Sequence, residues 1–175
     1  MGESWERVKQ EAMEIITATS SSSLPRLVVF DLDYTLWPFY CECRSKREMP
    51  KLYPHAKPIL LALKDMGIDV AIASRSPTAD VAIIFLDKLH IKSMFVAQEI
   101  YSSWTHKTEH FQRINRLTGV PFNSMLFFDD EDRNIEAVSK MGVTSILVDN
   151  GVDLRAFREG LAKFSRNSGS SGRNK

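Results

Sequence analysis

The sequence predicts an α/β fold built on a single Rossmann-like, doubly wound parallel sheet. Short apolar runs, several of them rich in Val, Ile and Phe, recur along the 175-residue chain at residues 27–30, 70–73, 94–97, 125–128 and 144–148. Runs that are apolar on both faces are typical of interior strands covered by helices. The segments between these runs carry helical periodicity, and a strict alternation of strand and helix favours right-handed crossovers within one sheet.

Helices are predicted between the runs, at residues 58–66, 78–90, 106–118, 133–141 and near 154–164. Gly67, Gly119 and Gly142 directly follow three of these segments. Glycine is the residue that most often ends a helix, so the spacing supports both the helices and their ends.

Residues 25–164 therefore form the predicted domain, flanked by two peripheral segments. Residues 1–24 are an N-terminal extension with an amphipathic helix around residues 5–16, whose apolar side carries Trp5, Val8, Met13 and Ile16. Residues 165–175 (SRNSGSSGRNK) are polar and rich in Gly and Ser, which predicts a disordered tail. We expect both segments to be solvated termini.

The composition excludes several classes of protein. A hydrophobic share of 43% is enough to build a core, and 23 basic residues against 22 acidic ones give a net charge of +1. That balance argues against a nucleic-acid or anionic-membrane partner, which requires a basic excess. Acidic residues interrupt the N-terminal segment where a signal peptide needs an apolar run, and no stretch is long enough to span a membrane. We expect a soluble, cytoplasmic monomer.

Residues 36–53 separate the first predicted strand from the first predicted helix of the domain. Loops of this kind usually have about two to six residues, and longer ones are often functional. The segment is thus a candidate flap over a site at the carboxyl edge of the sheet, although it is too short for a full cap domain. We expect Trp37 to pack in the core and Tyr40 to contact substrate, while Cys41 and Cys43 are expected to be free thiols.

Polar residues follow three of the predicted strands, at the edge where an open α/β sheet binds its ligands. They are Asp31, Asp33 and Thr35 after the first run, Ser74 and Arg75 after the second, and Asp129 and Asp130 after the fourth. Two carboxylates about 4 Å apart repel by roughly 4 kcal/mol at an effective dielectric constant near 20. A divalent cation would relieve this repulsion, and aspartates without nearby His or Cys favour Mg²⁺, which often binds substrate phosphate as well. The alternative is that these aspartates only cap the segments that follow them.

The same residues resemble those of a known family. Asp31-Leu32-Asp33-Tyr34-Thr35 resembles the DxDx[TV] signature of the haloacid-dehalogenase-like (HAD) hydrolases. Ser74, Lys107 and the pair Asp129-Asp130 resemble the remaining three motifs, in the family's order. The segments DLDYTLWPF, ASRSPT and FFDDEDRN are similar to those of the small magnesium-dependent phosphatases. The resemblance implies a HAD core without a full cap domain and a phosphatase activity that needs Mg²⁺.

The resemblance also implies a role for each residue. Asp31 would be the nucleophile that forms an aspartyl-phosphate, and Asp33 the general acid and base, oriented by the hydroxyl of Thr35. Mg²⁺ would be held by Asp31, the Asp33 carbonyl and Asp130, with Asp129 orienting a metal-bound water or Lys107. Substrate phosphate would be bound by Ser74, Lys107 and the backbone N–H groups of Leu32 and Arg75. We also expect the Arg75 side chain either to fix the Ser74 loop in place or to contact the leaving group of the substrate.

The substrates implied are phosphorylated small molecules or phosphoproteins, among them phosphotyrosine and sugar phosphates, including phosphorylated glycated amines. Two alternative functions stay open. The segment His106-Lys107-Thr108-Glu109-His110 matches the H-x-x-E-H zinc-hydrolase motif, whereas in a phosphatase we expect both histidines on the surface. Receiver-like signalling modules also combine a doubly wound sheet with Mg²⁺ and a phosphorylated Asp.

Overall fold

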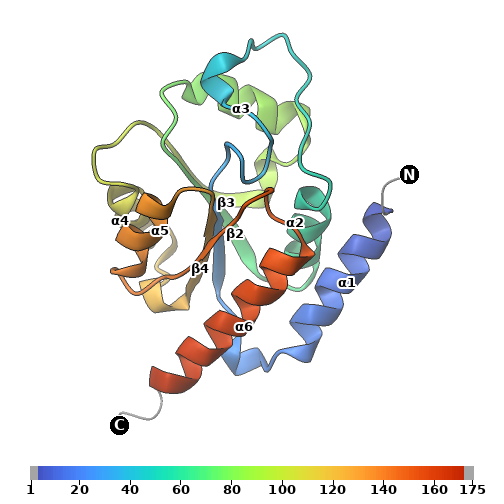
Figure 1. The fold of residues 1–175 in the computed structure, drawn as a ribbon, viewed down its shortest axis with the longest axis vertical. Helices are drawn as coiled ribbons and strands as arrows, with labels where there is room; N and C mark the ends of the chain where they lie inside the picture. Colours follow the sequence, from blue (N-terminus) through green and yellow to red (C-terminus); the bar gives the residue numbers. More distant parts are fainter. Residues whose placement is uncertain (1–3, 172–175) are drawn as a thin grey trace.

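A computed structural model describes residues 4–171 and confirms the predicted fold class (Figure 1). All five strands are parallel and form one sheet in the order β3-β2-β1-β4-β5. The strands are β1 (Leu27–Phe30), β2 (Asp69–Ser74), β3 (Phe95–Ile100), β4 (Met125–Asp129) and β5 (Thr144–Leu147). The helices are α1 (Trp5–Ala18), α2 (Ala56–Asp65), α3 (Ala79–Lys88), α4 (Thr108–Thr118), α5 (Asp132–Ser139) and α6 (Leu154–Ser171), with short 3₁₀ turns η1 (Ser21–Ser23), η2 (Cys41–Cys43), η3 (Lys92–Met94) and η4 (Phe122–Ser124).

The register of the sheet brings the motif residues to one edge. Phe30 at the end of β1 pairs with Ile72 of β2 on one side and with Phe128 of β4 on the other. The residues that follow therefore lie side by side: Asp31 after β1 and Asp129 at the end of β4. Strand β1 occupies the centre of the sheet, so its carboxyl end is flanked by both neighbours, where ligands of such sheets bind.

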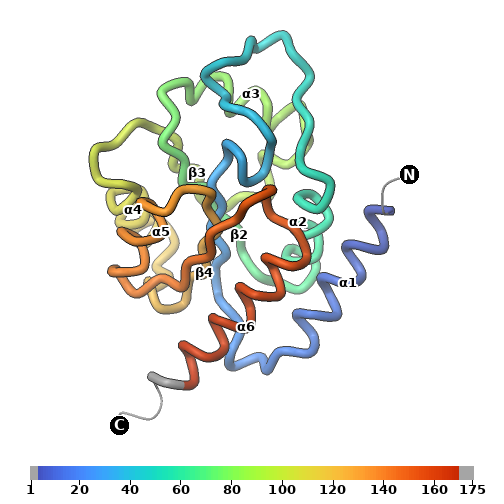
Figure 2. The backbone as a smooth tube through the Cα atoms, in the orientation of Figure 1, coloured from blue at the N-terminus to red at the C-terminus, as the bar shows by residue number. Residues whose placement is uncertain are grey.

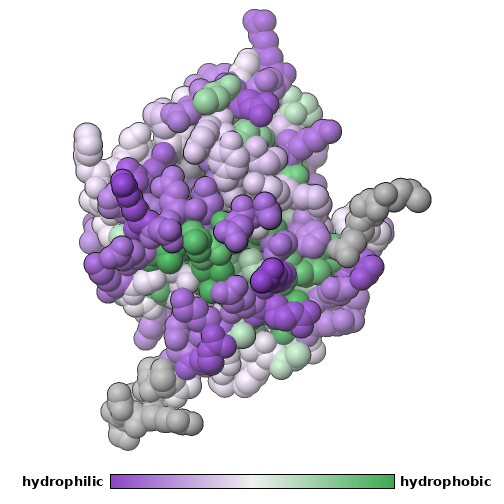
Figure 3. Space-filling view, in the orientation of Figure 1, coloured by the Kyte–Doolittle hydropathy of each residue, from purple (hydrophilic) through white to green (hydrophobic). Residues whose placement is uncertain are grey.

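Two apolar layers separate the sheet from its helices. Val28 and Phe30 face a layer shared with α1, α2, α3 and α6, whereas Leu27 and Val29 face a smaller layer shared with α4 and α5. The alternation within β1 follows from the period of two in a strand, and it explains why this run is apolar throughout. In the space-filling view, hydrophobic residues gather in the middle of the face and hydrophilic residues surround them (Figure 3).

The N-terminal helix differs from the expectation of a solvated terminus. Helix α1 packs against α2 and α6, and Val8, Ala12 and Ile16 are buried there (Figure 1). Trp5, which was placed on the same apolar side, is instead half exposed. A 14-residue helix of this kind is stabilised chiefly by packing of its apolar face.

The C-terminal helix also extends further than the sequence predicted. Helix α6 continues to Ser171, so the prediction of a disordered tail is wrong for residues 165–171; residues 172–175 lie outside the described part. Asn167 donates a hydrogen bond from its side chain to the hydroxyl of Thr144 at 2.9 Å, and Lys163 donates to the carbonyl of Ser145 at 3.0 Å. These bonds to β5 fix a sequence whose composition favours disorder.

The long loop of residues 36–53 lies beyond the carboxyl ends of the strands, at the top of the tube in Figure 2. It contains η2 and leads into α2. Trp37 is fully buried and stacks on Phe39 with ring centroids 5.3 Å apart, as expected for core packing. Within residues 4–171, no helix has the length and apolar character needed to cross a membrane.

Candidate active site

Three carboxylates meet at the carboxyl edge of the sheet. Asp31, Asp129 and Asp130 each place an oxygen within 4.8 Å of the others, and they form the one cluster of acids, histidines or cysteines suited to a metal ion in residues 4–171. Asp31 and Asp130 line a cavity of about 310 Å³. The cavity is also lined by Asp33, Tyr40, Glu42, Ser74, Arg75, Pro77, Lys107, Glu131 and Asn134. The predicted residues from three strand ends therefore converge on one hollow.

Lys107 donates hydrogen bonds to two of these carboxylates. Its side chain is only 1% exposed, and its ammonium group donates to Asp31 Oδ1 at 2.7 Å and to Asp129 Oδ2 at 2.5 Å. Burial alone would lower the pKa of Lys107, but the two carboxylates outweigh it and raise the pKa, so the lysine stays charged. The backbone of Lys107 is left-handed, with φ 75°, and this residue caps α4 rather than lying within a helix as predicted.

Asp129 is fixed on all sides. Besides Lys107, it accepts from the backbone N–H of Glu131 at 2.9 Å and from the side-chain amide of Asn134 at 3.1 Å. Of the two roles expected for Asp129, the contact with Lys107 is therefore present. Asn134 and Glu131 were not predicted as site residues, because a polar residue early in a helix is usually solvated.

The site carries more negative charge than the protein itself neutralises. Burial, reinforced by the neighbouring Asp31 and Asp129 carboxylates, raises the pKa of Asp130 to about 8. When all three acids of the cluster ionise, the Lys107 ammonium balances one of their charges and two remain uncompensated within the cluster, which favours a bound cation. The donors are all oxygens, the set that Mg²⁺ prefers. Asn134 Oδ1 is also buried without a donor among the described residues, an oxygen that a hydrated cation would satisfy.

Asp33 is held by the start of the loop rather than by Thr35. Its Oδ1 accepts from Trp37 Nε1 at 2.8 Å and from the backbone N–H of Cys41 at 3.0 Å. The Thr35 hydroxyl instead donates to Asp31 Oδ2 at 3.1 Å, so the expectation that Thr35 orients Asp33 is wrong. Burial raises the pKa of Asp33, although its two hydrogen bonds oppose the change. A raised pKa favours the protonated form that a general acid requires.

Ser74 and Arg75 line the cavity from the end of β2. Arg75 donates from Nε to the carbonyl of Ser103 at 3.0 Å, and its Nη1 lies 3.1 Å from Nδ1 of His106. Of its two expected roles, the structure shows a holding role, directed at the β3–α4 loop. The Leu32 side chain is buried in the core, so a contact between Leu32 and substrate would have to come from its backbone.

Tyr40, in the loop that follows β1, also lines the cavity. It is 47% exposed and packs edge-to-face against Tyr34 at 4.8 Å between ring centroids, so it is accessible for the substrate contact that the sequence predicts. The neighbouring Cys41 and Cys43 are both free, and burial raises the pKa of the Cys41 thiol to about 12, which keeps it protonated.

The two histidines of the zinc-like motif do not form a metal site. His110 is fully buried, contrary to the surface position expected, and its Nε2 lies 2.9 Å from each of the carbonyl oxygens of Ser74 and Tyr101. His106 faces Arg75 instead. Within residues 4–171, neither histidine belongs to a group of ligand atoms close enough together to hold a metal ion, so the zinc-hydrolase alternative has no support in this geometry.

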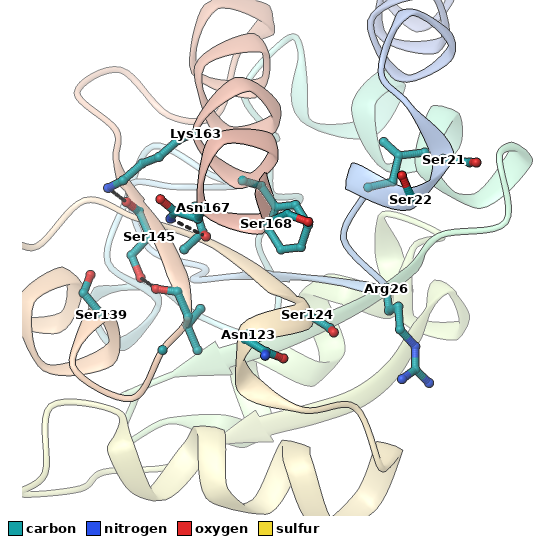
Figure 4. Close-up of a pocket in the computed structure, with 15 residues that line it drawn as sticks. Ser21, Ser22, Arg26, Asn123, Ser124, Ser139, Ser145, Lys163, Asn167 and Ser168 are labelled. Atoms are coloured by element: carbon teal, nitrogen blue, oxygen red, sulfur yellow. Dashed lines mark hydrogen bonds between the residues drawn. The ribbon is translucent and has the colours of Figure 1, made fainter. Parts of the chain in front are cut away.

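A larger cavity, of about 640 Å³, lies at the other end of the sheet, between α6 and the starts of β4 and β5 (Figure 4). Its lining is mostly Ser, Thr and Asn, with Arg26 and Lys163 as the charged groups. Among the described residues, no Asp, Glu, His or Cys lines this cavity, so they provide no carboxylate, imidazole or thiolate ligand for a metal ion there. The smaller cavity at the carboxyl edge, which is lined by acids and Lys107, is therefore the candidate active site.

An acidic, oxygen-only site at the carboxyl edge of a doubly wound sheet, with one buried lysine, is suited to enzymes that transfer phosphoryl groups. The comparisons with known proteins agree with this class. The acid phosphatase family model matches residues 23–51 and 44–167. Magnesium-dependent phosphatase 1 of Homo sapiens is 40% identical over 158 residues, covering 82% of this chain and 89% of the relative. A HAD-like hydrolase superfamily protein of Schizosaccharomyces pombe is 30% identical over 159 residues, covering 76% and 92%.

The chain therefore belongs to the HAD hydrolase superfamily and, within it, to the small magnesium-dependent phosphatases. Solved structures show the same fold. D,D-heptose 1,7-bisphosphate phosphatase from B. bronchiseptica, complexed with magnesium and phosphate, has a TM-score of 0.62 at 15% identity, over 86% of this chain and 99% of that one. A HAD-superfamily hydrolase from Ehrlichia chaffeensis has a TM-score of 0.62 at 11% identity, over 82% and 98%. The predicted family and the prediction of a phosphatase are confirmed.

Proposed function

We propose that this phosphatase hydrolyses phosphomonoesters with Mg²⁺, through an aspartyl-phosphate formed on Asp31. The proposal rests above all on the cluster of Asp31, Asp129 and Asp130, whose oxygens lie within 4.8 Å of one another. Such a cluster is unfavourable without a cation, and an oxygen-ligated cation that also binds phosphate accounts for it.

Asp31 is the nucleophile in this proposal. One of its carboxylate oxygens forms a bond to phosphorus while the bond from phosphorus to the ester oxygen breaks. Thr35 and Lys107 hold the two carboxylate oxygens of Asp31 in place, at 3.1 and 2.7 Å. The fixed ammonium of Lys107 also balances charge that gathers on the transferring phosphoryl group. Ser74, at the end of β2, donates to a phosphoryl oxygen.

Asp33 moves the proton. It gives its proton to the departing ester oxygen, and the alcohol leaves. It then takes a proton from the water that attacks the same phosphorus; the bond to Asp31 breaks, and inorganic phosphate is released with both carboxyl groups restored. Trp37 and Cys41 bind Oδ1 of Asp33, while Oδ2 accepts no hydrogen bond from residues 4–171 and is available for this transfer.

Mg²⁺ would be held by Asp31, Asp130 and the backbone carbonyl of Asp33. Asp129 would not ligate the metal directly, because its oxygens already accept hydrogen bonds from Lys107, Asn134 and the backbone of Glu131. When bound, the cation neutralises the carboxylates and the phosphate so that an anionic nucleophile can approach an anionic substrate.

The substrates proposed are phosphotyrosine, in peptides or proteins, and sugar phosphates, including phosphorylated glycated amines. The rim offers Tyr40 as an aromatic surface and Glu42 as an exposed acid that suits an amine. No cap domain encloses the cavity in residues 4–171, so a bulky substrate can reach it.

The test combines one substitution with two assays. Asp31→Asn should abolish hydrolysis of p-nitrophenyl phosphate in the presence of Mg²⁺ and remove phosphoryl labelling of the protein, while circular dichroism shows an unchanged fold. Asp87→Asn, which neutralises an exposed acid on α3, is the matched control and should retain activity. Activity retained by Asp31→Asn would refute the nucleophile. A phosphoryl group that stays on Asp31 for minutes without turnover would favour the receiver-like alternative.

A panel of phosphomonoesters then ranks the substrates. The proposal expects phosphotyrosine peptides or phosphorylated glycated amines to give the highest kcat/KM. A Tyr40→Ala variant should lower kcat/KM for these more than for p-nitrophenyl phosphate, and an equal loss for all substrates would remove Tyr40 from recognition.

A further inference from the structure

The second histidine of the HKTEH segment has no part in the mechanism above, yet it lies against the phosphate-binding end of β2. The His110 ring is fully buried in the first turn of α4. Its Nε2 faces two carbonyl oxygens, those of Ser74 and Tyr101, each at 2.9 Å. Carbonyl oxygens only accept hydrogen bonds, so Nε2 must carry the hydrogen and donate it to both.

The ring is neutral in this environment. Burial lowers the pKa of His110 to about 4, and the nearby Lys107 charge acts in the same direction. Nδ1 is buried and has no partner among the described residues. One ring nitrogen therefore makes every hydrogen bond of this side chain, and the other makes none.

The hydrogen bonds of His110 join three elements at one point. Ser74 ends β2, Tyr101 follows β3, and His110 itself belongs to α4. The ring also stacks on Tyr101, with centroids 4.1 Å apart and planes 15° apart, and the Tyr101 N–H donates to the same Ser74 carbonyl at 3.0 Å. The ends of two strands and the start of one helix are thus fixed to a single imidazole.

Two groups proposed to act on the phosphoryl group, Ser74 and Lys107, are connected to the His110 ring. Ser74 is bound directly through its carbonyl, and Lys107 is three residues before His110, at the cap of the same helix. The left-handed backbone of Lys107 and of His106, with φ 75° and 48°, is a conformation that free residues of these types seldom adopt. An anchor one turn into α4 keeps this conformation in place.

We propose that His110 is a positioning residue, which sets the distance between Ser74 and Lys107 by donating Nε2–H to the carbonyls of Ser74 and Tyr101. His110 does not touch substrate. The inference rests on the proposed function of Ser74 and Lys107 as phosphate-binding groups. Groups that orient the direct contacts of a site commonly affect activity by about 10- to 100-fold.

Two amide substitutions separate this role from a general role in packing. In His110→Gln, the side-chain amide nitrogen can occupy the place of Nε2 and donate to the same carbonyls. In His110→Asn, the shorter side chain places its amide nitrogen near the position of Nδ1, where no acceptor lies. Both variants are neutral and polar, and they differ mainly in where the donor stands.

The expected result is a loss of about 10- to 100-fold in kcat/KM for p-nitrophenyl phosphate in His110→Asn, with a weaker inhibition constant for inorganic phosphate, measured well below the melting temperature. His110→Gln should stay within about threefold of the native protein. The loss caused by His110→Asn should be smaller in a Ser74→Ala background than in the native protein, because the Ser74 hydroxyl that His110 helps to position is then already absent.

Several outcomes would overturn the inference. One is a His110→Asn variant that melts earlier but keeps the native kcat/KM, and another is equal impairment of the Asn and Gln variants. If His110→Asn does not fold, ¹⁵N NMR of the native protein decides: the inference expects the Nε2–H tautomer for one of the four histidines, with a signal that shifts when phosphate and Mg²⁺ are added. An Nδ1–H tautomer, or a signal that phosphate leaves unmoved, would refute it. A native protein without phosphatase activity would instead refute the proposed function.

Discussion

Replacing Lys107 by methionine would remove the one cation that lies between two buried carboxylates while keeping most of the side-chain volume. Lys107 is 1% exposed, and it donates to Asp31 at 2.7 Å and to Asp129 at 2.5 Å. Removing one partner of a buried ion pair typically costs about 3–5 kcal/mol, because the remaining charge is left uncompensated. In a chain of this size, each kcal/mol lowers the melting temperature by about 2–4 °C, so we expect a decrease of roughly 6–20 °C.

The assay is thermal unfolding followed by circular dichroism, without metal and with saturating Mg²⁺. Because Mg²⁺ would neutralise the same carboxylates, it should raise the melting temperature of Lys107→Met more than that of the native protein. Lys140→Met is the matched control: Lys140 is exposed and pairs with Glu136 on α5, so its loss should change stability by less than about 1 kcal/mol.

A Lys107→Met protein as stable as the Lys140→Met control would refute the reasoning, since the carboxylates would then need no compensating charge. An equal rise in melting temperature of the native and Lys107→Met proteins on addition of Mg²⁺ would also refute it, because the metal would then not bind at the carboxylates that Lys107 contacts.

Three further predictions follow from the same contacts. Asp130→Asn should weaken Mg²⁺ binding by at least about tenfold in isothermal titration calorimetry, and an unchanged affinity would place the metal elsewhere. Ile16→Ala, in the face of α1 that packs on α2 and α6, should cost about 2–5 kcal/mol in urea unfolding, whereas Ile83→Ala at the surface of α3 should cost less than about 1 kcal/mol; equal losses would mean that α1 contributes little. Because the pKa of His110 falls from 6.5 to about 4 on folding, the unfolded chain binds its proton first as the pH decreases. Between pH 6.5 and 4, the free energy of unfolding of the native protein should therefore decrease by up to about 3 kcal/mol more than that of His110→Gln. Parallel pH profiles of the two free energies would contradict this.

Much of the fold follows from the sequence because its signals are local. The β1 run at residues 27–30 matches the observed strand, and Gly119 ends α4 with the positive φ of 71° that made it a credible helix end. The convergence of Asp31 and Asp129 also follows, since parallel strands bring their carboxyl ends to one edge.

The parts that the sequence did not predict depend on contacts between distant residues. The amphipathic helix α1 was predicted, but its packing on α2 and α6 was not; residues 165–171 have the composition of a solvated end, and contacts with β5 hold them in α6. Within the site, Thr35 lies two residues from Asp33 and four from Asp31, and the tight turn after β1 decides in favour of Asp31. No sequence pattern distinguishes a buried Asn134 from the many solvated asparagines of helix starts.

The bond from the Cys41 N–H to Asp33 limits where evolution can remodel the entrance of this enzyme. Residues 33–41 form a closed loop, because Trp37 and Cys41, four and eight residues after Asp33, both donate hydrogen bonds to the Asp33 carboxylate, the proposed general acid. An insertion within this loop would displace the hydrogen bonds that hold Asp33, and so would disturb the proposed proton transfer as well as the entrance of the cavity. Residues 42–49 are exposed and lie outside this loop, so the chain can be lengthened or replaced there while the hydrogen bonds to Asp33 stay in place.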